Sequence, residues 1–67
     1  MTQYMVKKID LSKCKNIDEY WEAVNNAPVH YCNGVNELRE YCGGNIHRQR
    51  NGYSGINGNM EYVAVKA

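Results

Sequence analysis

The chain of 67 residues contains no phenylalanine, and six tyrosines and one tryptophan supply its aromatic side chains instead. A tyrosine hydroxyl needs water or a hydrogen-bond partner when the ring is buried, so these side chains do not build a thick, dry core. A chain this short also buries only about 60% of its unfolded surface. We therefore expect a single domain over residues 1–67, with a thin core and partly exposed tyrosines.

The sequence also lacks a charge excess of either sign and a long apolar run. Eight basic and seven acidic side chains give a formal net charge of +1, which argues against histone-like and DNA-mimicking proteins. No apolar run reaches the roughly 18 residues of a transmembrane helix. The first eight residues carry their two lysines after the apolar side chains, unlike a signal peptide. We expect a cytoplasmic protein that does not bind membranes.

Cysteine is scarce, and the three present, Cys14, Cys32 and Cys42, are an odd number. An odd count is a poor disulfide framework and favours reduced thiols in the cytosol; one bridge with a cysteine left over is the alternative. His30 and His47 complete the set of soft metal ligands, but the spacing contains none of the close pairs that zinc sites use. The sequence therefore predicts no metal site and no cofactor.

Cys32 is the one candidate nucleophile, because it precedes a predicted helix whose dipole would lower the pKa of a thiol. A histidine would then act as the base. No third group that would orient such a base can be identified, and so short a chain has little room to enclose a pocket. We therefore expect a protein that is not an enzyme and has no catalytic residues.

Strand and helix patterns follow one another in the first half of the chain. Residues 3–9 alternate in polarity as a strand does. A helix follows from Asn16, which with Glu19 approximates a capping box. Four apolar residues then recur at helical spacing and predict one buried stripe: Ile17, Tyr20, Trp21 and Val24.

Pro28 ends that helix and opens a polar turn before a second, shorter helix that begins near Asn33 or Gly34. The second helix is predicted to bury a line formed by Val35, Leu38 and Tyr41 or Cys42. Two glycines at 43–44 suit its C-terminus.

The last third of the chain is predicted to form a hairpin. Residues 46–50 alternate as a strand, residues 51–59 contain two Asn-Gly pairs and predict a turn or loop, and residues 60–66 form a strong strand. The expected fold is therefore α+β in the order β-α-α-β-β, with a three-stranded sheet and two helices packed on one face.

The turn before the second helix and the exposed face of that helix are the candidate surface for binding a partner protein. Tyrosine and arginine are favoured hot-spot residues at interfaces. The predicted partner-binding residues are His30, Tyr31, Asn33, Asn36, Arg39 and Glu40.

A second candidate patch lies on the strand at residues 46–50. Arg48 and Arg50 are two residues apart, so a strand would project both from one face, and Tyr53 can stack on a nucleic-acid base. The alternative interpretation is an edge strand whose charges only protect it from aggregation. The patch is thus a candidate nucleic-acid or second binding site.

Part of the chain also resembles a known family in residues 9–44. The similar features are a strand end, a helix, a proline, a tyrosine turn and a short helix, carried by Ile9–Lys13, Asp18–Tyr20 with Ala23, Pro28, Tyr31, and Val35–Glu40 with Gly43 and Gly44. In this pattern the chain resembles the first half of barstar-like ribonuclease inhibitors. The resemblance implies a parallel pairing of the early strands and a binding surface over residues 28–40.

The chain departs from the family at the positions that matter for binding a basic ribonuclease. Cys32 replaces the glycine of the turn, Gly34 the helix asparagine, Asn36 the first acidic residue and Arg39 the tryptophan, and His30 stands in place of an interface tyrosine. Most of the acidic surface is therefore missing. If the relation holds, the target is something other than a strongly basic nuclease active site.

We expect a small intracellular inhibitor that occludes the functional surface of another protein. Antitoxin-like proteins of phages and mobile elements are often chains of this size, and a nuclease or nucleic-acid-processing enzyme is a candidate partner. The alternative is a small regulator that binds RNA or DNA through Arg48 and Arg50. A free edge strand would also allow a homodimer formed by sheet extension.

Overall fold

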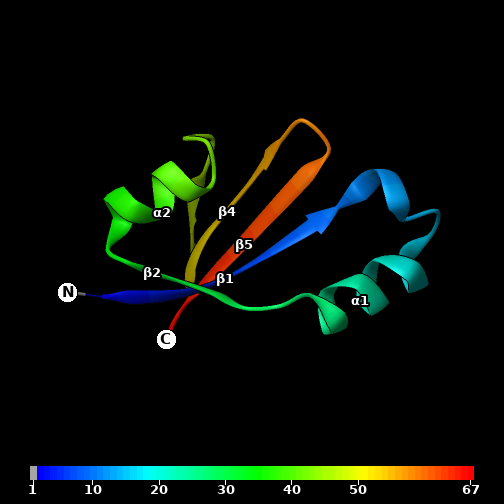
Figure 1. The fold of residues 1–67 in the computed structure, drawn as a ribbon, viewed down its shortest axis with the longest axis horizontal. Helices are drawn as coiled ribbons and strands as arrows, with labels where there is room; N and C mark the ends of the chain where they lie inside the picture. Colours follow the sequence, from blue (N-terminus) through cyan, green and yellow to red (C-terminus); the bar gives the residue numbers. More distant parts are fainter. Residues whose placement is uncertain (1) are drawn as a thin grey trace.

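The computed structural model describes residues 2–67, which form five strands and two α-helices. The strands lie in the order β2-β1-β5-β4-β3, and every neighbouring pair is antiparallel (Figure 1). The elements in chain order are β1 (Gln3–Asp10), the 3-10 helix η1 (Leu11–Lys13), α1 (Ile17–Asn26), β2 (His30–Asn33), α2 (Val35–Tyr41), β3 (His47–Gln49), β4 (Gly52–Asn57) and β5 (Met60–Lys66).

The fold is α+β, but the prediction of a three-stranded sheet was wrong, because β2 and β4 add two strands. Strand β2 is a four-residue edge strand in which only Cys32 is buried, so its sequence has no clear alternation. Strand β4 contains Gly52 and Gly55, which resembled turn residues. Both glycines are needed there, since a Cβ atom would collide with the carbonyl oxygen of Ala64 or of Asn45.

The early strands do not pair as the family resemblance implies. β1 and β2 run antiparallel, with Val6 opposite His30 and Met5 opposite Tyr31. Helix α1 lies in the connection between them, and the chain returns along the same sheet edge.

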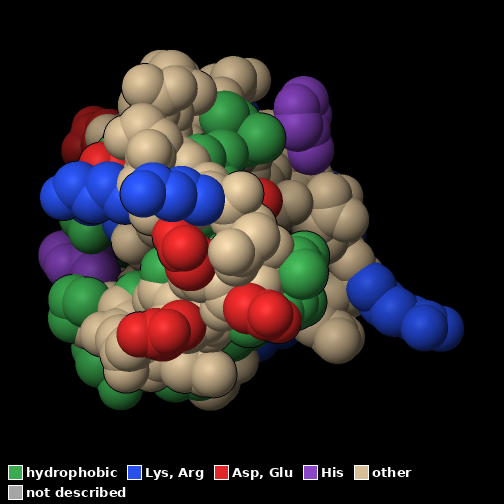
Figure 2. Space-filling view, turned by 90° about the vertical axis from the view of Figure 1, so that its right-hand side faces the viewer, with side chains coloured by type: hydrophobic (Ala, Val, Ile, Leu, Met, Phe, Trp, Pro, Cys, Tyr) green, Lys and Arg blue, Asp and Glu red, His purple; other side chains and the backbone are tan. Residues whose placement is uncertain are grey.

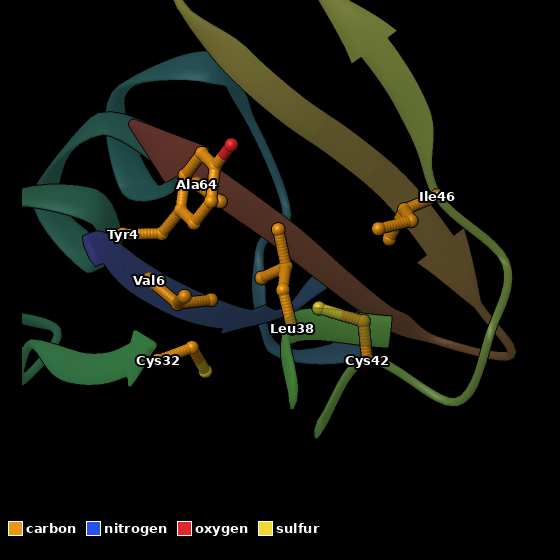
Figure 3. Packing of buried hydrophobic residues seen from close by; sticks show 7 residues of the cluster. All are labelled: Tyr4, Val6, Cys32, Leu38, Cys42, Ile46 and Ala64. Atoms are coloured by element: carbon orange, nitrogen blue, oxygen red, sulfur yellow. The ribbon is translucent and has the colours of Figure 1, made fainter. Parts of the chain in front are cut away.

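Helix α2 covers one face of the sheet and forms the core with it (Figure 3). Leu38 and Cys42 are fully buried against this face, as the predicted helix line required. The helix is shorter than expected, because Gly34 with φ 87° precedes it and two glycines of positive φ follow it. The amide of Gly44 donates to the carbonyl of Arg39 at 2.8 Å, which closes the end of the helix. The buried cluster consists of Tyr4, Val6, Cys32, Leu38, Cys42, Ile46 and Ala64.

Helix α1 contacts the opposite face, so the prediction that both helices pack on one face was wrong. The Lys7 Nζ atom donates to the Val24 carbonyl at 2.8 Å, and the Tyr20 hydroxyl donates to the Glu61 carboxylate. Lys7 and Glu61 alternate with the core residues of β1 and β5 and therefore point away from α2. Figure 1 shows the two helices at opposite ends of the sheet.

The start of α1 follows the predicted capping chemistry. The Asn16 Oδ1 atom accepts from the Glu19 amide at 2.8 Å, which confirms Asn16 as the N-cap. The Glu19 carboxylate accepts from the Lys15 amide at 3.1 Å, one residue before the expected partner. Within residues 2–67, neither helix is long and apolar enough to cross a membrane.

Candidate binding site on the open face of the sheet

The face of the sheet that points away from α2 carries apolar side chains. Met5 and Ile9 of β1 share this face with Val63 and Val65 of β5. Only Ile9 is sealed from solvent, at 2% exposure, near the end of the sheet that α1 contacts. We call this surface the open face.

Helix α1 leaves a groove beside it rather than closing over the sheet. The groove has a volume of about 260 Å³. It contains one cation, Lys7, and no carboxylate. The groove is lined by Met5, Lys7, Ile9, Val24, Val29, Val63 and Val65.

The apolar stripe of α1 is only partly shielded from solvent, because no residue of this helix is buried. Trp21 was predicted to lie in a buried stripe, yet it is 56% exposed. Its indole packs edge-to-face on the Tyr20 ring, with the ring centroids 5.2 Å apart. Asp18 and Glu22 of this helix are exposed and Glu19 is partly exposed, and Figure 2 shows acidic side chains on this end of the molecule.

The large apolar side chains that are exposed within residues 2–67 lie on α1, in the groove and on the open face. Tyr31 is 53% exposed and shares the open face because it pairs with Met5. Ile56 shares it because it pairs with Glu61. The full set is Ile17 and Trp21 on α1, Val29 in the groove, and Tyr31, Ile56 and Val65 on the open face.

The six predicted partner-binding residues do not form one surface. The alternation of β2 sends Tyr31 and Asn33 toward the open face and His30 toward α2, where its ring stacks on Tyr41 with centroids 4.0 Å apart. Asn36, Arg39 and Glu40 are exposed on α2. Residues 30–33 were not predicted to form a strand. Predicting that strand would have shown that His30 points to the opposite face from Tyr31 and Asn33.

The second predicted patch does come together, with five additional residues that include Tyr4 and Lys66. Arg48, Arg50 and Tyr53 line a hollow of about 160 Å³ that also includes Tyr4 and Lys66. Arg50 lies in the turn just after β3 and not on the strand itself. Among the residues that were missed, Tyr4 and Lys66 come from the ends of β1 and β5, and only the pairing of these two residues brings them here. We call this hollow the basic pocket.

The pKa values of the two buried cysteine thiols, Cys32 and Cys42, are raised. All three cysteines are free, and Cys32 and Cys42 are buried. Burial and the nearby Glu37 raise the pKa of the Cys32 thiol, so the expected lowering by a helix dipole is wrong. Burial and the neighbouring Cys32 raise the pKa of Cys42 to about 11. Residues 2–67 contain no group of three or more metal-binding side chains.

Comparisons with protein-family models, with curated proteins and with solved structures found no match to this chain. The structure itself shows a small α+β domain in which one face of the sheet is covered and the other, the open face, is apolar and partly exposed.

Proposed function

We propose that this protein binds another protein on its open face and inhibits that partner by covering part of its functional surface. The observation that carries the proposal is the gathering of all the exposed large apolar side chains of residues 2–67 on this face and on α1. The solvent face of an antiparallel sheet is normally polar. An apolar one, rimmed by polar residues, is typical of an interaction site.

The expected occupant is an apolar helix or strand of the partner that carries an acidic residue. The lining of the groove is apolar except for Lys7, and no carboxylate in the lining neutralises that ammonium group. A partner carboxylate would complement it, while apolar side chains would fill the remaining volume. The groove is smaller than the roughly 300–1,000 Å³ of small-molecule sites, which supports a side-chain ligand over a substrate.

The exposed aromatic residues give the contact most of its area. A buried aromatic side chain removes about 150–250 Å² from water. Trp21 and Tyr31, each slightly more than half exposed, would therefore contribute roughly 100 Å² apiece when covered. Neither residue lines the groove: Tyr31 pairs with the lining residue Met5, and Trp21 lies on α1, the helix that supplies Val24 to the lining.

The proposal is tested by placing a photoreactive amino acid at Val65 in cells and identifying what it captures. The captured partner is then purified, and its affinity is measured for the wild-type protein and for Val65→Asp. We expect the affinity to fall at least tenfold, because the aspartate would place a negative charge beside Lys7 in the apolar groove. The matched control is Asn36→Asp, which adds the same charge at an exposed residue of α2, outside the open face and the groove lining, and should keep the affinity within twofold.

Other occupants give distinct results. A crosslink between two copies of the chain would make the open face a homodimer interface, and a nuclease-sensitive product would make it a nucleic-acid site. Either result, or an equal loss in both variants, would contradict the proposal.

A further inference from the structure

The basic pocket lies on the α2 side of the sheet, on the face opposite the groove. Tyr4 and Lys66 face each other across β1 and β5, and Arg48 faces Tyr53 across β3 and β4. The register of β5 with β4 places Tyr53 beside Ala64, on the same face as Tyr4. Three segments that are distant in sequence therefore converge on one hollow.

The charges in this pocket are unbalanced. Arg48, Arg50 and Lys66 line it, and no aspartate or glutamate does. The whole chain has eight cations and a net charge of only +1. Three cations in one hollow of about 160 Å³ therefore give this part of the surface a local positive potential.

We propose that the basic pocket binds a phosphate group of a single-stranded nucleic acid. Two guanidinium groups and an ammonium group offer the charge-assisted donors that phosphate oxygens accept. The pocket is too small for a whole strand, so it would take one phosphate with part of its sugar. This site is separate from the open face and does not depend on the function proposed above.

Tyr53 favours a nucleic acid over a phosphorylated peptide. Its ring is half-buried, and it meets the buried Tyr4 ring edge-to-face, with centroids 5.7 Å apart and planes at 77°. Tyr4 therefore holds Tyr53 in place at the wall of the pocket. A fixed aromatic ring beside cations suits a stacked base next to its phosphate.

The test measures the binding of a fluorescently labelled ten-nucleotide uridine RNA by anisotropy at several salt concentrations. One bound phosphate predicts a slope of about −0.7 for log affinity against log salt on a single strand. Arg48→Gln with Arg50→Gln should weaken binding at least tenfold at low salt and bring the slope close to zero. Both arginines are exposed, so the fold should survive, and circular dichroism checks this.

The matched control is Lys13→Gln with Lys15→Gln, which removes the same two charges from residues outside the pocket. This variant should bind the RNA within threefold of the wild type. Equal losses in the two double variants would show unspecific electrostatic attraction and would overturn the proposal. Absence of binding at low salt would overturn it as well.

Amide chemical shifts locate the ligand independently of any variant. RNA should shift the amides of Arg48–Tyr53, Tyr4 and Lys66, and shifts confined to other residues would overturn the assignment. Uridine monophosphate should compete weakly for the same amides, which supports a nucleotide phosphate. A phosphoserine peptide or inorganic phosphate that competes as well as the RNA would overturn the choice of a nucleic acid.

Discussion

Gly52 shows at the scale of one residue how closely β4 and β5 approach beside the basic pocket. A Cβ atom at this position would collide with the Ala64 carbonyl oxygen. Gly52→Ala should therefore lower the free energy of unfolding by about 1–3 kcal/mol, since the two strands must move apart. Urea denaturation measures the change.

A matched glycine provides the control. Gly58 has φ +64°, and no atom lies within 4 Å of the point that a Cβ would occupy, so Gly58→Asn should cost less than about 1 kcal/mol. If Gly52→Ala is no more destabilising than Gly58→Asn, the close approach of the two strands is not a real constraint.

Tyr20 predicts how stability depends on pH in the alkaline range. The hydrogen bond to Glu61, and then burial, raise the pKa of Tyr20 to about 12 from its ordinary value of 10. The neutral phenol therefore stabilises the folded state fully below pH 10, and this contribution is lost as the pH rises toward 12. Urea midpoints of the wild type should fall more steeply over this range than those of Tyr20→Phe. Parallel curves for the two proteins would show that the hydrogen bond does not stabilise the fold.

At the scale of elements, the shorter helix stabilises the fold more than the longer one. Leu38 of α2 is fully buried, whereas α1 buries no residue. Leu38→Ala should cost about 2–5 kcal/mol of unfolding free energy. Trp21→Ala should cost less than about 2 kcal/mol, because more than half of the indole already lies in solvent. Thermal unfolding of both variants measures the two losses of unfolding free energy. Similar losses would mean that Trp21 packs in the core as Leu38 does.

Elements with local signals were predictable from the sequence. The cap at Asn16, the glycines after α2 and the alternation of β5 each depend on residues close in the chain, and all three predictions are confirmed. β2 and β4 were missed because they are specified by partners far away in sequence. β2 pairs only with β1. The glycines of β4 are required because β5 and the segment at Asn45 approach its backbone too closely for a Cβ atom.

The two candidate sites differ in the same way. The alternation of a strand grouped Arg48 with Arg50, but Lys66 joins them through the pairing of chain ends. The sequence pattern predicted the apolar stripe of α1. How far that stripe is exposed to solvent depends on where the helix meets the sheet. A pattern predicts which side chains share a face, and only the tertiary packing decides whether that face is covered.

On the scale of the whole molecule, the sheet separates two surfaces of different chemistry. The open face offers apolar side chains around Lys7, and the α2 side offers three cations around Tyr53. A change on one surface should leave the other intact. Val65→Asp should therefore weaken docking of the partner protein at least tenfold and RNA binding less than threefold, and the Arg48 and Arg50 double variant should do the reverse.

The exposed surface of α2 is the remaining place where a partner protein would dock, and one double variant decides between it and the open face. Asn36→Ala with Arg39→Ala removes two exposed side chains from α2 and touches no residue of the groove lining. We expect the affinity for the captured partner to stay within twofold, because the open face supplies the apolar area that docking needs. Calorimetric titration of the purified pair measures this. A tenfold loss in this variant, with Val65→Asp unchanged, would move the binding surface to α2.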